Sequence, residues 1–120
     1  MKENAIRDKS FVFALRVVKL AKFLEDKKRE FVLSRQVLRS GTAIGALVRE
    51  AEHAESRADF IHKMSIALKE ANETSYWLEL LYQGEYIDKE SFESISSDSE
   101  EIIKLLVAIV KTSKVSKLSE

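Results

Sequence analysis

The chain has 120 residues, which is enough for one ordinary domain and too short for two. Its 20 Lys plus Arg balance 20 Asp plus Glu, so bulk charge does not favour the coating of nucleic acid or of an anionic membrane. The absence of Cys excludes disulfides, thiolate metal sites and cysteine nucleophiles, while 45% apolar residues suffice for a hydrophobic core.

Hydropathy and the first residues of the chain predict the cellular location of the protein. No apolar run reaches the roughly 18 residues that a membrane span requires. The opening Met-Lys-Glu-Asn lacks the features of a secretory signal peptide. We therefore expect a soluble, cytoplasmic protein with no membrane partner.

The scarcity of turn-forming residues predicts an all-α fold. Proline is absent and glycine occurs three times, whereas proteins built from strands and turns use both more often. Ala, Leu, Glu and Lys, which are strong helix formers, are among the commonest residues. We expect one domain over residues 1–120, an antiparallel up-down-up-down four-helix bundle with helices at about 9–28, 34–54, 57–83 and 88–112.

The first expected helix, capped by Asp8 or Ser10 and ending near Lys28, has a very wide apolar surface. At 100° per residue, one half-cylinder is apolar, and further apolar residues lie beside or beyond it. The outer helix of a small monomeric bundle needs a narrower stripe, so the excess predicts a second buried face and hence self-association. The half-cylinder holds Phe13, Ala14, Val17, Val18, Leu20, Ala21 and Leu24, and the excess is Phe11, Val12, Leu15 and Phe23.

Two glycines, Gly41 and Gly45, stand four residues apart in the second expected helix. Each costs about 1 kcal/mol relative to Ala in a helix interior, so a structural reason for them is expected. Small residues at this spacing let the backbone of a neighbouring helix approach closely. The pair therefore predicts close packing of another helix.

Local signals mark the ends of the third helix and the start of the fourth. Ser56 followed by Asp59 has the form of a capping box, and Gly84 stands where a C-cap residue belongs. Asp88 is a good N-cap for the fourth helix.

The rest of the fourth helix is less clear from the sequence. The polar stretch Ser-Ser-Asp-Ser-Glu-Glu at 96–101 leaves open whether this helix bends or restarts. We expect residues 113–120 to form a frayed tail.

The two histidines each follow a carboxylate by three residues, in Glu50-x-x-His53 and Asp59-x-x-His62. In di-metal helix bundles, paired Glu-x-x-His motifs and two further Glu point into the core. Here the pairs flank a hairpin at one end of the bundle, lack the additional ligands, and include a residue needed for capping. A metal site is therefore a weak alternative to ordinary surface residues, and we expect no cofactor.

Motifs of catalysis give little support for an enzyme. The sequence has no Gly-x-Ser-x-Gly elbow and no glycine-rich phosphate loop. Glu70 and Glu73 lie one turn apart, but a solvated or ion-paired helix face explains this pair better than acid–base chemistry. We therefore expect no catalytic residues.

Charge is divided unevenly between the two halves of the chain. Residues 1–60 hold 13 basic and 9 acidic side chains, and residues 61–120 hold 7 and 11. Two interpretations remain open: the basic face of one subunit meets the acidic face of the next, or the basic residues form a ridge for phosphates. The candidate contacts, to backbone phosphate rather than to bases, are Arg16, Lys19, Lys22, Arg35, Arg39 and Arg49.

Five segments together resemble the signature of a known family. They are residues 32–46, 49–56, 59–64, 66–74 and 76–81, within a resemblance that covers roughly residues 10–90. The chain resembles the bacterial four-helix bundle family first noticed in intervening sequences of 23S ribosomal RNA genes. The accessory variability determinant of diversity-generating retroelements is similar to that family.

This resemblance implies an antiparallel four-helix bundle assembled as a ring-like homopentamer. The retroelement relative is a basic pentamer that binds nucleic acid and associates with a reverse transcriptase, while most family members have no established activity and offer no catalytic residues to carry over. The present chain differs in being neutral and in having Leu47 where the family usually has Asn.

Residues and resemblance together lead to one functional expectation. We expect a non-enzymatic, homo-oligomeric adaptor that binds RNA, DNA, a ribonucleoprotein or a reverse transcriptase-like protein through the basic faces of its first two helices. The first alternative is a protein-interaction scaffold with no nucleic-acid role. The weaker alternative is a metal-binding bundle.

Overall fold

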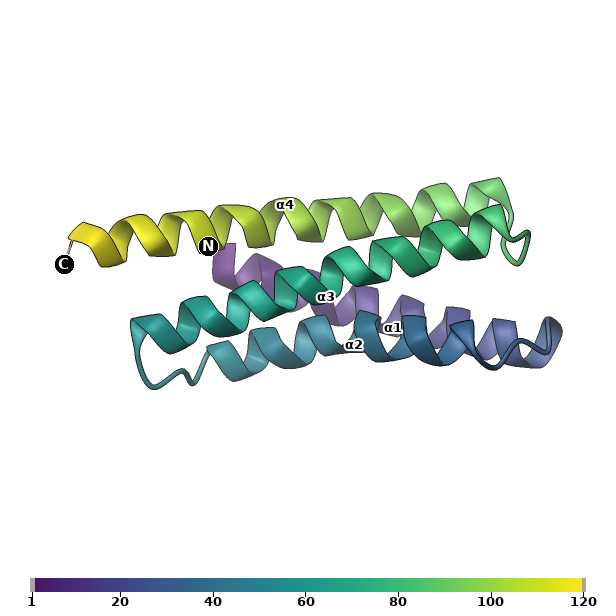
Figure 1. Cartoon of the computed structure of the whole chain (residues 1–120), viewed down its shortest axis with the longest axis horizontal. Helices are drawn as coiled ribbons and strands as arrows, with labels where there is room; N and C mark the ends of the chain where they lie inside the picture. Colours follow the sequence, from purple (N-terminus) through teal and green to yellow (C-terminus); the bar gives the residue numbers. More distant parts are fainter. Residues whose placement is uncertain (1, 120) are drawn as a thin grey trace.

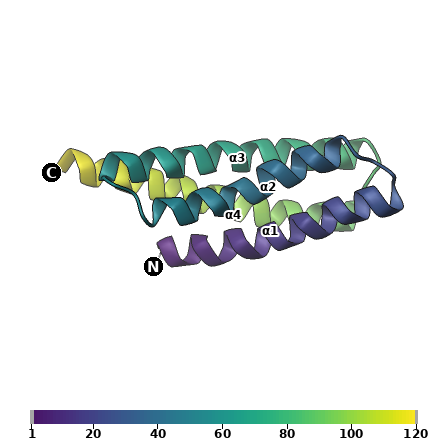
Figure 2. The ribbon, with the colours of Figure 1, turned by 90° about the horizontal axis from the view of Figure 1, so that it is seen from below.

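A computed structural model describes the backbone of residues 2–119 and the side chains of residues 5–116. Over these residues the chain forms four helices and no strand: α1 (Lys2–Lys27), α2 (Leu33–Ala51), α3 (Arg57–Gln83) and α4 (Lys89–Ser119). Successive helices run in opposite directions, and each packs against its two neighbours around the bundle (Figures 1 and 2). The predicted all-α four-helix bundle is confirmed, while the ring-like assembly stays a prediction.

Apolar side chains from all four helices form one continuous core along the rod, which measures 52 × 22 × 19 Å. Phe13 and Val17 of α1, Ile44 of α2, Leu78 of α3 and Leu106 of α4 are at most 1% exposed. Complete burial of a side chain of this size stabilises the folded state by about 1.5–3 kcal/mol. The core therefore contributes most of the energy that holds the helices together.

Hydroxyl pairs join neighbouring helices at fixed points of this core. Thr74 Oγ1 of α3 donates to Ser40 Oγ of α2 at 2.9 Å. The hydroxyls of Ser75 on α3 and Ser99 on α4 lie 2.7 Å apart. Because hydrogen bonds are directional, these pairs fix how far each helix is shifted along its neighbour.

The predicted start of the first helix is wrong, because α1 begins at Lys2 instead of near residue 9. Ser10, a predicted cap, is buried inside the helix, and its hydroxyl donates to the carbonyl of Arg7 at 3.1 Å. Ile6 is fully buried, so the first turns have their own contact with the core. That contact stabilises helix where local signals alone favour a later start.

The second helix ends at Ala51, three residues before the predicted position 54. The N–H groups of Glu52, His53 and Ala54 each donate to the carbonyl three residues earlier, at 3.1–3.2 Å. These tighter bonds form a closing turn in which the chain leaves the helix. His53 therefore lies outside the regular helix that carries Glu50.

The third helix has the bounds that its local signals predict, Arg57–Gln83. Ser56 Oγ accepts a hydrogen bond from the Asp59 N–H at 3.0 Å, and Asp59 Oδ2 accepts one from the Glu55 N–H at 3.1 Å. Gly84 occupies the C-cap, and Glu85 follows it with a left-handed φ of 67°.

The fourth helix continues without a break through 96–101, and the predicted frayed tail is helical as far as Ser119. Ser99 pairs with Ser75, and Asp98 is bound by Arg16 of α1, so this polar stretch has partners that suit a continuous helix. Beyond it, Ser113 is still buried. Glu120 lies outside the described residues. In Figure 1, α4 extends past the start of α1.

Candidate functional site

Arg16, the first predicted phosphate contact, ties α1 to α4. Its Nη1 lies 2.5 Å from Asp98 Oδ2, and its Nη2 donates to Ser94 Oγ at 2.9 Å. The Arg16 and Asp98 side chains are 35% and 44% exposed, so this is a surface ion pair. A phosphate at Arg16 would have to displace these intramolecular acceptors.

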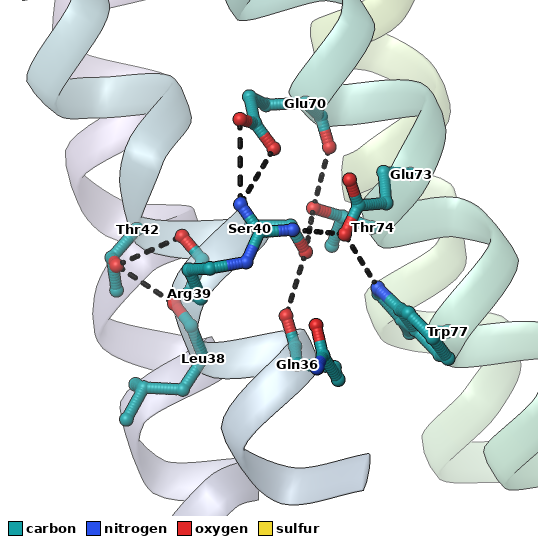
Figure 3. Close-up of polar contacts among 9 residues, drawn as sticks. All are labelled: Gln36, Leu38, Arg39, Ser40, Thr42, Glu70, Glu73, Thr74 and Trp77. Carbon is teal, nitrogen blue, oxygen red and sulfur yellow. Dashed lines mark hydrogen bonds and ion pairs between the residues drawn. The ribbon is translucent and has the colours of Figure 1, made fainter.

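Arg39, another predicted phosphate contact, lies between two carboxylates of α3 (Figure 3). Its Nη1 is 3.3 Å from Glu70 Oε1, and its Nη2 donates to Glu73 Oε2. The same Glu73 oxygen accepts a hydrogen bond from Trp77 Nε1 at 2.9 Å. Donation by Trp77, with further help from Arg39, lowers the pKa of Glu73, and its carboxylate in turn raises the pKa of Arg39.

The other four predicted contacts lie in two different settings. The Arg49 guanidinium is stacked over the ring of Phe11, 5.1 Å from its centroid. Lys19, Lys22 and Arg35 are exposed and make no ion pair or side-chain hydrogen bond within the described residues 5–116. The six residues therefore do not form one uniform ridge, and these three cations remain available to an anion.

Helix α1, which carries Lys19 and Lys22, also has an exposed apolar face. Phe11, Leu15 and Val18, at positions i, i+4 and i+7, are 46–49% exposed. The contact between Phe11 and Arg49 places this face on the side of α1 next to α2. The residues beyond it, Val12 and Phe23, are also exposed. The structure thus leaves exposed all four apolar residues predicted as an excess, and it also exposes Val18, which was predicted to belong to the main apolar half-cylinder.

The two glycines of α2 differ in how closely α1 approaches them. A Cβ at Gly41 would lie 2.7 Å from Val17 Cγ1, which is too close for a real contact. A Cβ at Gly45 would lie 3.5 Å from the Ser10 carbonyl oxygen, which is an ordinary van der Waals distance. Only Gly41 is therefore required by the close approach of α1.

The four candidate metal ligands do not converge. Glu50 faces Lys63 across 3.5 Å, and Asp59 serves the start of α3. His53 and His62 are both exposed, and the hollow that Glu50, His53 and Asp59 line does not include His62. Among the described residues no group of three or more His, Asp or Glu side chains is placed to hold a metal ion. Within that same part of the chain, no helix combines the length and apolarity needed to span a bilayer.

Comparison with known proteins gives a family and a closely similar structure. Residues 2–108 match the family model described as 23S rRNA-intervening sequence protein. A crystal structure from Bacteroides thetaiotaomicron, described as a protein with unknown function from the S23 ribosomal protein family, is 63% identical in sequence. It covers 92% of this chain and 99% of its own, with a TM-score of 0.91. A search of curated proteins gives no match.

Proposed function

The chain belongs to the 23S rRNA-intervening sequence protein family, and we propose that it acts as a non-enzymatic adaptor in the form of a homo-oligomer. The observation that carries this proposal is the exposed apolar face of α1, formed by Phe11, Leu15 and Val18. These side chains follow one line over about 10 Å at 1.5 Å per residue. A contiguous exposed apolar face of this kind is typical of a protein–protein contact.

Charge supports a contact between unlike faces of two copies. The apolar face is accompanied by basic side chains, because Lys22 follows Val18 by four residues on α1 and Arg49 of α2 is stacked over Phe11. On α3 and α4 the exposed carboxylates include Glu79, Glu93 and Glu100. A basic, apolar face of one copy against an acidic face of the next is a head-to-tail contact, which generates a ring if the rotation closes.

Light scattering of matched variants tests the self-association. We expect the wild type to have a mass of several times 13.7 kDa and Val18→Glu to lower it toward one chain, because a carboxylate would be buried without a partner. Val32→Glu is the control, since Val32, just before α2, is 70% exposed and lies outside both the apolar face of α1 and the acidic face of α3 and α4. A wild-type mass of 13.7 kDa at working concentration contradicts the proposal.

Binding of nucleic acid is a second candidate function, favoured by Lys19, Lys22 and Arg35, which have no ion pair or side-chain hydrogen bond among the described residues 5–116. Backbone phosphates are the acceptors that such exposed cations suit, with affinity that falls as salt rises. We would titrate a structured RNA and a matched DNA duplex by fluorescence anisotropy across a salt series. Arg35→Ala is expected to weaken binding and reduce the salt slope by about 1, whereas Arg39→Ala, which removes a guanidinium already held by Glu70 and Glu73, has less effect. Flat anisotropy at low salt rules this candidate out.

A further inference from the structure

A groove opens between α1 and α4 at the end of the bundle where α3 turns into α4. Its volume is about 940 Å³, within the range of roughly 300–1,000 Å³ typical of ligand clefts. Arg16 closes its inner end by bridging to Ser94 and Asp98. Beyond Arg16, no hydrogen bond or ion pair joins residues 17–28 to α4 within the described part of the chain. From Arg16 onward the groove is lined by Lys19, Leu20 and Phe23 of α1 and by Lys28 just after it. We call this space the α1–α4 groove.

The α1–α4 groove has an apolar floor and two edges of opposite charge. Leu20 of α1, Ile95 of α4 and Ile87 of the loop contribute to the floor. Lys19 lines the groove from α1 and Glu90 from α4, and both side chains are exposed without an ion pair among the described residues. Lys28 adds to the basic edge, and Glu85 and Asp88 add to the acidic edge.

We infer that the α1–α4 groove binds one amphipathic α-helix of a partner protein, with acidic side chains along the flank that faces α1 and basic side chains along the flank that faces α4. From Arg16 to Lys28 the groove follows α1 for about 18 Å, which is about three helical turns. A small ligand with one charge would meet an edge of its own sign. A helix satisfies both edges, because it presents two flanks beside its apolar stripe.

This groove is distinct from the proposed self-association face. Phe11, Leu15 and Val18 lie on the α2 side of α1, whereas the groove lies on its α4 side. Both surfaces can therefore be occupied in one assembly. The inference rests on the proposed adaptor function, for which it names the chemistry of the partner.

A designed peptide provides the first test. The probe is a fluorescein-labelled helical peptide of about 14 residues with leucines along one face, Glu along one flank and Lys along the other. We expect saturable binding to the full chain by anisotropy. Lys19→Glu and Glu90→Lys should each weaken it about 5-fold, because one flank then meets like charge. The double variant K19E/E90K should recover part of this loss, because a peptide bound in the reverse direction meets both changed residues with opposite charge.

Matched control variants make the same charge changes outside the groove. Glu100→Lys and Lys111→Glu on α4 alter exposed residues that do not line it and that lie about 15 Å or more along the helix from Glu90. They should leave the affinity within about 2-fold, since distant surface charges are screened.

The direction of the bound peptide gives a readout that nonspecific apolar binding does not share. Because the chain has no Cys, single cysteines can be placed at the inner end by Ser94→Cys and at the outer end by Glu85→Cys. A peptide with an N-terminal Cys should form a disulfide with only one of the two variants. Exchange of its Glu and Lys flanks should move the disulfide to the other, because reversing a helix in its groove exchanges its flanks.

Three outcomes overturn the inference: no saturable binding, equal weakening by the control variants, or equal cross-linking at both ends. A fourth is dissociation of the oligomer by Lys19→Glu or Glu90→Lys in light scattering, which would make a second copy of this chain the occupant. Failure of the Val18→Glu experiment, by contrast, contradicts the self-association alone.

Discussion

Helix α1 packs against α2 and α4 along two seams, meaning the lines of contact between adjacent helices, and these differ sharply in width. Against α2 it approaches so closely that a Cβ at Gly41 would lie 2.7 Å from Val17 Cγ1. Against α4, beyond Arg16, it leaves a groove of about 940 Å³. The difference follows from side-chain size: Gly41, Gly45 and Ser10 lie where α1 meets α2, whereas aromatic and long charged residues such as Tyr82 and Lys19 line the groove. A tight seam on one side holds α1 in place and leaves its other side available for binding.

The largest effect is expected from filling the tight seam. Gly41→Ala places a methyl group against Val17, a β-branched residue with little freedom to move. Overpacking of this kind costs about 1–3 kcal/mol, of which about 1 kcal/mol is offset by the better helix propensity of Ala. We therefore expect a lower free energy of unfolding, measured by urea denaturation with circular dichroism.

Gly45→Ala is the natural control for this experiment. Its new Cβ would make an ordinary contact at 3.5 Å with the Ser10 carbonyl oxygen, so the gain in helix propensity remains. We expect stabilisation by up to about 1 kcal/mol. Equal destabilisation by both substitutions would show that α1 approaches Gly45 as closely as it approaches Gly41.

Arg16 ties α1 to α4 at the inner end of the α1–α4 groove, and Arg16→Gln removes this tie. Because Arg16 and Asp98 are 35% and 44% exposed, the free energy of unfolding should fall by less than about 1 kcal/mol. The main effect should be local, namely faster hydrogen exchange of amides in residues 89–98. Lys9→Gln, which removes the 2.9 Å pair with Glu101 in the same seam, should leave that exchange unchanged. Equal effects of both variants would contradict a special role for Arg16.

Helix ends governed by neighbouring residues were predictable from the sequence, and those governed by distant contacts were not. The start of α3 is set within four residues by Ser56 and Asp59, so its signal is local. By contrast, α1 extends to Lys2 beside a buried Ile6, and α4 continues through Ser99 because Ser75 pairs with it. Each of these depends on how the helices pack, which sequence periodicity does not specify.

The residues of the candidate site were likewise predictable where the signal is local and not where it depends on another helix. The excess apolar residues Phe11 and Leu15 were identified by helical spacing alone, and they are exposed, whereas Val18, which the same spacing placed in the main apolar half-cylinder, is also 46% exposed. The acceptors of Arg16 and Arg39 come from α4 and α3, so no local pattern could have indicated that these cations are paired. The α1–α4 groove was missed for a related reason, because its two edges meet only in the folded bundle.

A pH-dependent effect is expected in the α2–α3 seam, at Glu73. Its pKa is lowered in the folded state, chiefly by the Trp77 N–H and also by Arg39, so folding favours the charged carboxylate. This stabilisation is present above the unfolded pKa and is lost as pH falls through the lowered folded pKa. Glu73→Gln should therefore cost less than about 1 kcal/mol at neutral pH and nothing in acid. Urea denaturation at both pH values measures the difference.

Glu79→Gln is the comparison for Glu73→Gln. It removes an exposed carboxylate of α3 that has no ion pair among the described residues. Its small effect should be the same at both pH values. A Glu73→Gln cost that persists in acid would show that Glu73 acts through packing rather than through charge.

The smallest effect is expected at the mouth of the α1–α4 groove, where Glu85 has a φ of 67°. A side chain in this left-handed conformation is strained, and glycine adopts it freely. Glu85→Gly should therefore raise the free energy of unfolding by about 0.5 kcal/mol after the entropy of the unfolded glycine is subtracted. Glu85→Ala removes the same carboxylate but keeps the strained backbone, so it should give no gain. A gain with both variants would mean that repulsion among the acidic residues of the groove, rather than backbone strain, limits stability at this turn.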